Sequence, residues 1–177
     1  MDTADDGTQT ARSLAAWLDR LQFTELPADR ATARIIDAIT EWGTSQGWRV
    51  YRRAPSVFPL PPPLSGNSVV DVACARPSAA PVVVEVDRLD RPRTVDKLLA
   101  EAAAGRVAIW VRWGAGPFEA PPLPVHLVTR PAVRRQGSWH TVADRPPPPH
   151  SAAPIEASAP EELPWGADGG TRRGSLP

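Results

Sequence analysis

Three acidic side chains interrupt the two most valine-rich runs of the chain. Asp71 lies inside the run at residues 69–74, and Glu85 and Asp87 lie in the run that begins at residue 82. A carboxylate on a buried strand is costly unless a cation or hydrogen bonds compensate for its lost hydration. The chemistry of this region therefore depends on what compensates the three acids.

A bound cation is one answer, because of the way strand side chains alternate. Glu85 and Asp87 are two residues apart, so they share one face of a strand. If the two runs pair as an antiparallel hairpin, a register exists in which Asp71 projects from the same face. Clustered carboxylates repel one another, and Mg²⁺ (or Mn²⁺) relieves that repulsion while keeping coordination positions for substrate phosphates. The pattern predicts a metal site at Asp71, Glu85 and Asp87.

The alternative is that the acids lie on a half-solvated face or pair with Arg52, Arg53 or Arg88. A second chemical candidate is Lys97, the one lysine among twenty basic residues. An ammonium can lose its proton when it is desolvated, and a guanidinium effectively cannot, so a lysine suits proton handling. Equally, Lys97 could pair with Glu101 at i+4 on an exposed helix face. Both interpretations remain open from the sequence.

Composition limits the classes of protein that are possible. The 177 residues carry twenty basic and twenty acidic side chains, but residues 48–135 have a net charge of +6 and the two ends are acidic. A basic middle segment is compatible with a polyanionic partner. A single cysteine, Cys74, excludes an internal disulfide and is expected in the core. No signal peptide or membrane-spanning run is visible, so we expect a cytoplasmic protein.

The elements that must position these residues follow from periodicity and from the positions of Gly and Pro. We expect disorder over residues 1–10, one α/β domain over residues 11–135, and a disordered Pro/Ala-rich tail over residues 136–177. Helices are predicted at residues 11–24, after an Asp29 cap, and at residues 94–106, with Thr94 as N-cap. Strands are predicted at residues 48–58, 68–75, 81–88, 107–113 and 124–129.

The order of motifs and elements resembles the PD-(D/E)XK nuclease superfamily. In this order an acid lies on one strand, an E-x-K-like motif lies on the next, and a helix and a further strand follow. The resemblance covers about residues 30–129. It implies a restriction-endonuclease-like α/β fold with an αβββαβ core, whose mixed sheet is flanked by helices. Asp71 looks like the first acid, although Val70 replaces the usual proline, and Glu85 looks like the second. Asp87 stands where lysine is expected, as in very-short-patch-repair-like endonucleases, and Lys97 is similar to a lysine that has migrated to the helix.

The resemblance implies metal-dependent hydrolysis of phosphodiester bonds in nucleic acid, with DNA as the expected partner. Asp71, Glu85, Asp87 and Lys97 would then be the catalytic residues. Arginines expected to contact the nucleic-acid backbone are Arg52, Arg53, Arg88, Arg91 and Arg93. The alternative is a catalytically inactive nuclease-fold module that binds nucleic acid or a protein, the latter through the N-terminal helix or the tail. A homodimer is also possible, and no membrane partner is expected.

Overall fold

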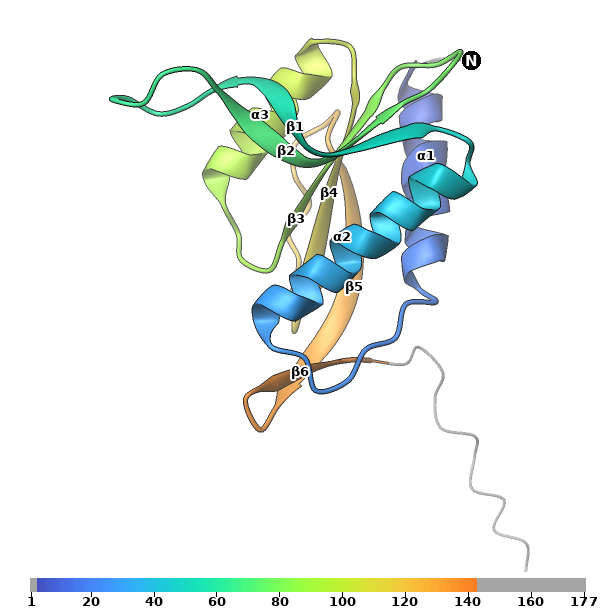
Figure 1. Ribbon diagram of the computed structural model, residues 1–177, viewed down its shortest axis with the longest axis vertical. Coiled ribbons are helices and arrows are strands. Elements are labelled where there is room, and N and C mark those ends of the chain that lie inside the picture. The colour runs from blue at the N-terminus through green and yellow to red at the C-terminus, as the bar shows by residue number, and fades with distance from the viewer. Residues whose placement is uncertain (1–2, 143–177) are drawn as a thin grey trace, which may run out of the picture. The chain divides into compact units, whose positions relative to one another are not determined.

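The protein is an α/β structure in which three helices flank a six-stranded mixed sheet (Figure 1). The computed structural model describes residues 3–142. Its elements are α1 (Thr3–Leu18), α2 (Ala28–Ser45), β1 (Arg49–Pro59), β2 (Asn67–Ala75), β3 (Val82–Asp87), α3 (Pro92–Ala103), β4 (Val107–Gly114), β5 (His126–Arg135) and β6 (Ser138–Thr141). The predicted α/β class and mixed sheet are confirmed.

The six strands lie in the sheet in their chain order, from β1 to β6. β1, β2 and β3 form an antiparallel meander, because short loops connect them. β3, β4 and β5 are parallel, and α3 makes the crossover between β3 and β4. β6 returns antiparallel to β5. β4 has a neighbour on each side and all of its residues are buried, as its apolar sequence predicted.

The two faces of the sheet carry different helices. Val82, Val84 and Val86 of β3 belong to the larger core cluster, which α1 and α2 cover, whereas Val83 belongs to a smaller cluster beneath α3. Strand alternation therefore places Glu85 and Asp87 on the α3 face with Val83. Cys74 is buried in the larger cluster, and burial raises the pKa of its thiol to about 11.

A buried carboxylate fastens α3 to β1. Glu101 is fully buried, accepts hydrogen bonds from the Ser56 hydroxyl and from the Val57 backbone N–H at 2.8 Å, and pairs with Arg106. The cost of burying this charge is offset because several donors converge on it. The interaction fixes the position of α3 above the sheet.

Both ends of the domain extend beyond the predicted boundaries. α1 begins at Thr3, so the expectation of disorder over residues 1–10 is wrong for residues 3–10, and the helix ends at Leu18 rather than at residue 24. Arg76 stabilises its first turns by contacting both carboxylate oxygens of Asp6, at 2.6 and 2.9 Å. β6 lies in the segment predicted to be a disordered tail. Its Trp139 ring packs edge-on against Trp113, with 5.2 Å between the ring centroids. The rest of that predicted tail, residues 143–177, lies outside the described residues.

Neither predicted helix cap is used. The residue before α2 is Pro27, and Asp29 lies inside the first turn without a capping bond. α3 starts two residues before Thr94, and the Thr94 hydroxyl bonds to a side chain of β3 instead. Within residues 3–142, no helix is long and apolar enough to cross a membrane.

Candidate functional site

The ladder between β2 and β3 stops where the acidic residues begin. Its last pair is Val72 with Val84, and beyond it the Val86 backbone N–H donates to Asp71 Oδ2 at 2.9 Å. A side-chain carboxylate thus satisfies a donor that the ladder leaves free. We call the three acids at this point, Asp71, Glu85 and Asp87, the acidic fork.

The strand alternation predicted for β2 fails at the fork. Val70 was expected to share a face with Val72 and Cys74, but it packs in the cluster beneath α3. Opposite this point, Arg53 of β1 has a left-handed backbone with φ of 51°. Both strands therefore depart from regular geometry where Asp71 turns toward its partners.

Lys97 contacts the fork directly. Its Nζ lies 2.7 Å from Glu85 Oε1 and donates a second hydrogen bond of 2.7 Å to the Val69 carbonyl. The Lys97 side chain is 13% exposed and that of Glu85 is 8% exposed, so the pair is largely withdrawn from water. The predicted convergence of Lys97 with the acids is present, and the alternative pairing with Glu101 is wrong.

The electrostatics of the fork are dominated by burial. Desolvation raises the pKa of Glu85 to about 7, the negative charge of Asp71 adds to the rise, and Lys97 opposes it. Desolvation also raises the pKa of Asp71, with partial compensation from the Val86 N–H. The protein therefore leaves negative charge at Asp71 and Glu85 incompletely compensated.

Asp87 is held more completely by the protein. Its Oδ2 accepts hydrogen bonds from Thr94 Oγ1 at 2.9 Å and from Trp110 Nε1 at 3.1 Å, and Arg91 Nε lies 3.5 Å from its Oδ1. These contacts fasten the first turn of α3 to β3 and β4. Asp87 thus orients the helix that carries Lys97.

The described residues, 3–142, contain no group of three or more His, Cys, Asp and Glu side chains that could hold a metal ion. The predicted three-carboxylate ligand set is therefore not assembled here. Asp71 and Glu85 remain as candidate ligands, which is the number of carboxylates that Mg²⁺ commonly takes in proteins. Their raised pKa values are the electrostatic condition that a cation would relieve.

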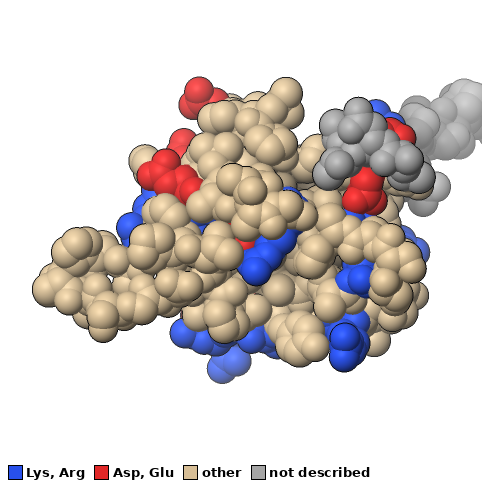
Figure 2. Space-filling model, turned by 90° about the horizontal axis from the view of Figure 1, so that it is seen from above, with Lys and Arg blue, Asp and Glu red and all other residues tan. Residues whose placement is uncertain are grey.

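Two of the predicted phosphate-contacting arginines lie near the fork. Arg91 pairs with Asp87, and the positive charge of Arg53 partly opposes the rise that burial causes in the pKa of Asp71. No ion pair of Arg53 is found in the described part of the chain. In Figure 2, Lys and Arg side chains lie along the lower edge and near the centre of the face, and acidic side chains lie mainly in its upper half.

The other three predicted arginines have local partners. Arg52 pairs with Asp37 of α2, Arg88 lies 5.4 Å above the ring of Trp139, and Arg93 lies 4.7 Å above the ring of Phe58. These contacts do not orient them toward a common point. The sequence predicted their basic character but not these partners.

The sequence did not predict that Thr94 and Trp110 donate hydrogen bonds to Asp87. It also did not predict the arginine that lies beside these residues. Arg112 pairs in register with Asp87, is 5% exposed, and lies 4.5 Å above the ring of Trp110. Its Nη1 is 3.8 Å from Asp90 Oδ1. The sequence feature that could have identified Arg112 is that it is a lone arginine in an otherwise apolar strand. No sequence feature identifies Trp110, because its contact with Asp87 depends on how β3 and β4 align.

In comparisons with known proteins, no family model matches the chain and no curated protein matches it. The class of the protein is therefore given by its fold, which is α/β with a six-stranded mixed sheet. The acidic fork is the feature of this fold that could carry out chemistry.

Proposed function

We propose that the acidic fork is the hydrolytic centre of a metal-dependent, nuclease-like protein that cleaves phosphodiester bonds in nucleic acid. The observation that carries the proposal is the approach of Lys97 Nζ to within 2.7 Å of Glu85, beside Asp71, at the point where β2 and β3 part. The order α2, β1, β2, β3, α3, β4 also agrees with the αβββαβ core of a restriction-endonuclease-like fold.

The side chains at and around the acidic fork would have separate roles in this reaction. Asp71 and Glu85 would hold Mg²⁺ or Mn²⁺, which when bound lowers the pKa of a water and stabilises charge on the phosphate. Lys97 has three N–H donors, and two of them are used by Glu85 and the Val69 carbonyl. The third has no acceptor among residues 3–142, and it would donate to the attacking water or to a phosphate oxygen. Arg53 and Arg91 attract the nucleic-acid backbone.

The test is cleavage of single- and double-stranded DNA and RNA by the full chain with Mg²⁺ or Mn²⁺. Asp71→Asn, Glu85→Gln and Lys97→Met should each reduce the rate by about 100-fold or more. Glu119→Gln, which changes an exposed acid on a loop, is the matched control and should cleave like the wild type. Absence of cleavage on every substrate would overturn the proposal.

A second candidate is a catalytically inactive module with this fold that binds nucleic acid or a protein partner. It is favoured by one observation: protein donors already contact each carboxylate of the fork. Calorimetry separates the two candidates. Binding of Mg²⁺ that is lost in Asp71→Ala supports the hydrolase, whereas no uptake of Mg²⁺ or Mn²⁺ supports the inactive module.

A further inference from the structure

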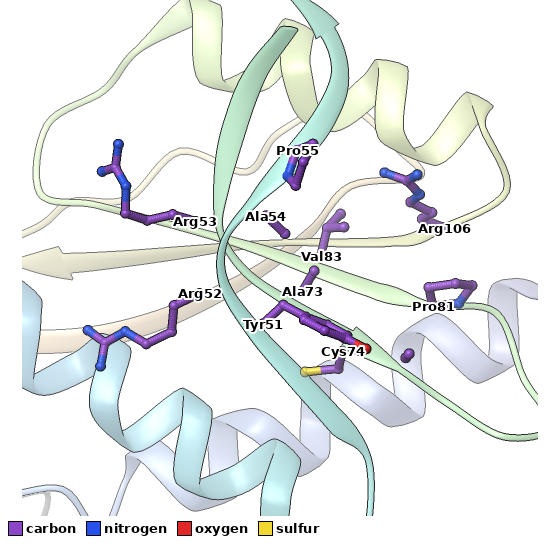
Figure 3. Close-up of a pocket in the computed structure, with 11 residues that line it drawn as sticks. Tyr51, Arg52, Arg53, Ala54, Pro55, Ala73, Cys74, Pro81, Val83 and Arg106 are labelled. Atoms are coloured by element: carbon purple, nitrogen blue, oxygen red, sulfur yellow. The ribbon is translucent and has the colours of Figure 1, made fainter.

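A pocket of about 400 Å³ opens on the α3 side of the sheet (Figure 3). Tyr51, Ala73 and Val83 form one row across β1, β2 and β3, and all three line the pocket. The rest of its lining is Arg52, Arg53, Ala54, Pro55, Cys74, Ala75, Pro81 and Arg106. The volume is within the range of small-molecule sites, and small or apolar side chains form most of its surface.

The pocket and the fork are neighbouring rows of the same sheet. Ala73 and Val83 lie two residues from Asp71 and Glu85 on their strands, a separation of about 7 Å. On β1, Arg53 lies between the residues that pair with Val72 and Val70, which places it opposite Asp71. Arg53 therefore lies where the pocket meets the fork.

The charges at the rim favour an anionic ligand. Arg52 and Arg106 are already paired with Asp37 and Glu101. Arg53 also lines the pocket, and the described residues provide it with no ion pair. A ligand with an apolar, planar body and an adjacent negative group would place the body on Tyr51, which is 50% exposed, and the charge at Arg53.

We propose that this pocket binds an unpaired nucleobase of single-stranded nucleic acid, stacked on Tyr51, with the adjoining phosphate at Arg53. The inference rests on the proposed function for the identity of the polymer, and it specifies the substrate class. A base inside a duplex is stacked between its neighbours and cannot enter such a pocket without being flipped out. Stacking on an aromatic ring is tolerant of sequence, so binding is expected without strong base preference.

The experiment measures fluorescence anisotropy of labelled oligo-dT, and of a duplex of equal length, with the full chain in EDTA. Without a divalent cation, binding is read independently of cleavage. Tyr51→Ala should weaken oligo-dT binding by about 5- to 100-fold, the loss expected for one stacked base. Tyr51→Phe, which keeps the ring, should restore it. Because Tyr51 is half exposed, folding should persist, and urea unfolding midpoints verify that.

Arg53→Gln tests the phosphate contact. Removing one contact should reduce the slope of log affinity against log salt by about 0.7 for a single strand. Arg134→Gln, which changes an exposed arginine of β5, is the matched control and should keep the wild-type slope. An oligonucleotide with abasic positions should bind more weakly to the wild type but not to Tyr51→Ala.

The outcomes distinguish this inference from the proposed function. Tight oligo-dT binding that needs Tyr51, together with no cleavage in Mg²⁺, would support the pocket and overturn the hydrolase. Cleavage that needs Asp71, with unchanged affinity in Tyr51→Ala, would overturn the pocket alone. Equal affinity for duplex and single strand would also overturn it. The pocket proposal would also be overturned if the protein bound the apolar anion 8-anilinonaphthalene-1-sulfonate and oligo-dT did not displace it.

Discussion

Glu85 should make the stability of the protein depend on pH. The direction of that dependence shows whether burial or the ion pair with Lys97 controls the pKa of Glu85. Burial and the charge of Asp71 raise its pKa from the ordinary value of 4.5 to about 7, although Lys97 contacts it. Between these two pH values the folded state holds a proton that the unfolded state has lost. The unfolding free energy therefore falls as pH rises from 4.5 to 7. At 1.36 kcal/mol per pH unit, the loss is about 3 kcal/mol.

The assay compares urea unfolding of the wild type and Glu85→Gln, followed by tryptophan fluorescence from pH 4.5 to 8 in EDTA. Groups that titrate in both proteins largely cancel in the difference. The wild-type minus variant unfolding free energy should fall by about 3 kcal/mol across this window and level off above pH 7. Repeating the series with Mg²⁺ should flatten the fall, because a cation at the fork favours the charged carboxylate.

A difference that stays constant, or that rises with pH, would refute the reasoning. It would mean that the ion pair with Lys97 outweighs desolvation and holds Glu85 charged throughout. The acidic fork would then be a neutralised structural cluster, and the electrostatic argument for a cation would fail.

Three further substitutions test the packing around the site. Glu101→Gln should lower the unfolding free energy by about 2–3 kcal/mol, because hydrogen bonds to a buried charge are weakened, whereas Glu119→Gln should change it little. Thr94→Val should cost about 1–3 kcal/mol, since Asp87 loses a buried donor, and Thr94→Ser should recover most of that. Gly43→Ala should cost about 1–3 kcal/mol, because a Cβ there would lie 2.8–2.9 Å from two core side chains. Chemical unfolding measures all three, and wild-type midpoints would contradict them.

Local periodicity determined much of the fold. The alternation in β3 placed Glu85 and Asp87 on one face, and that face is the one that α3 covers. The apolar stripes predicted α2 and α3, and the continuous apolar run predicted the buried β4. These patterns are properties of neighbours in the chain, so a sequence reports them directly.

Contacts between distant segments decided the rest. The first turns of α1 are held by Arg76, seventy positions further along. β6 pairs with β5 and, through Trp139, with Leu26, which is distant in the chain. Within the site, the choice of Lys97 between Glu85 and Glu101 depends on how α3 lies across the sheet. An i+4 spacing makes the helix pair possible, but packing buries Glu101 among other donors. Burial and register arise only when the whole chain has folded, which is why the tertiary structure alone assigns these partners.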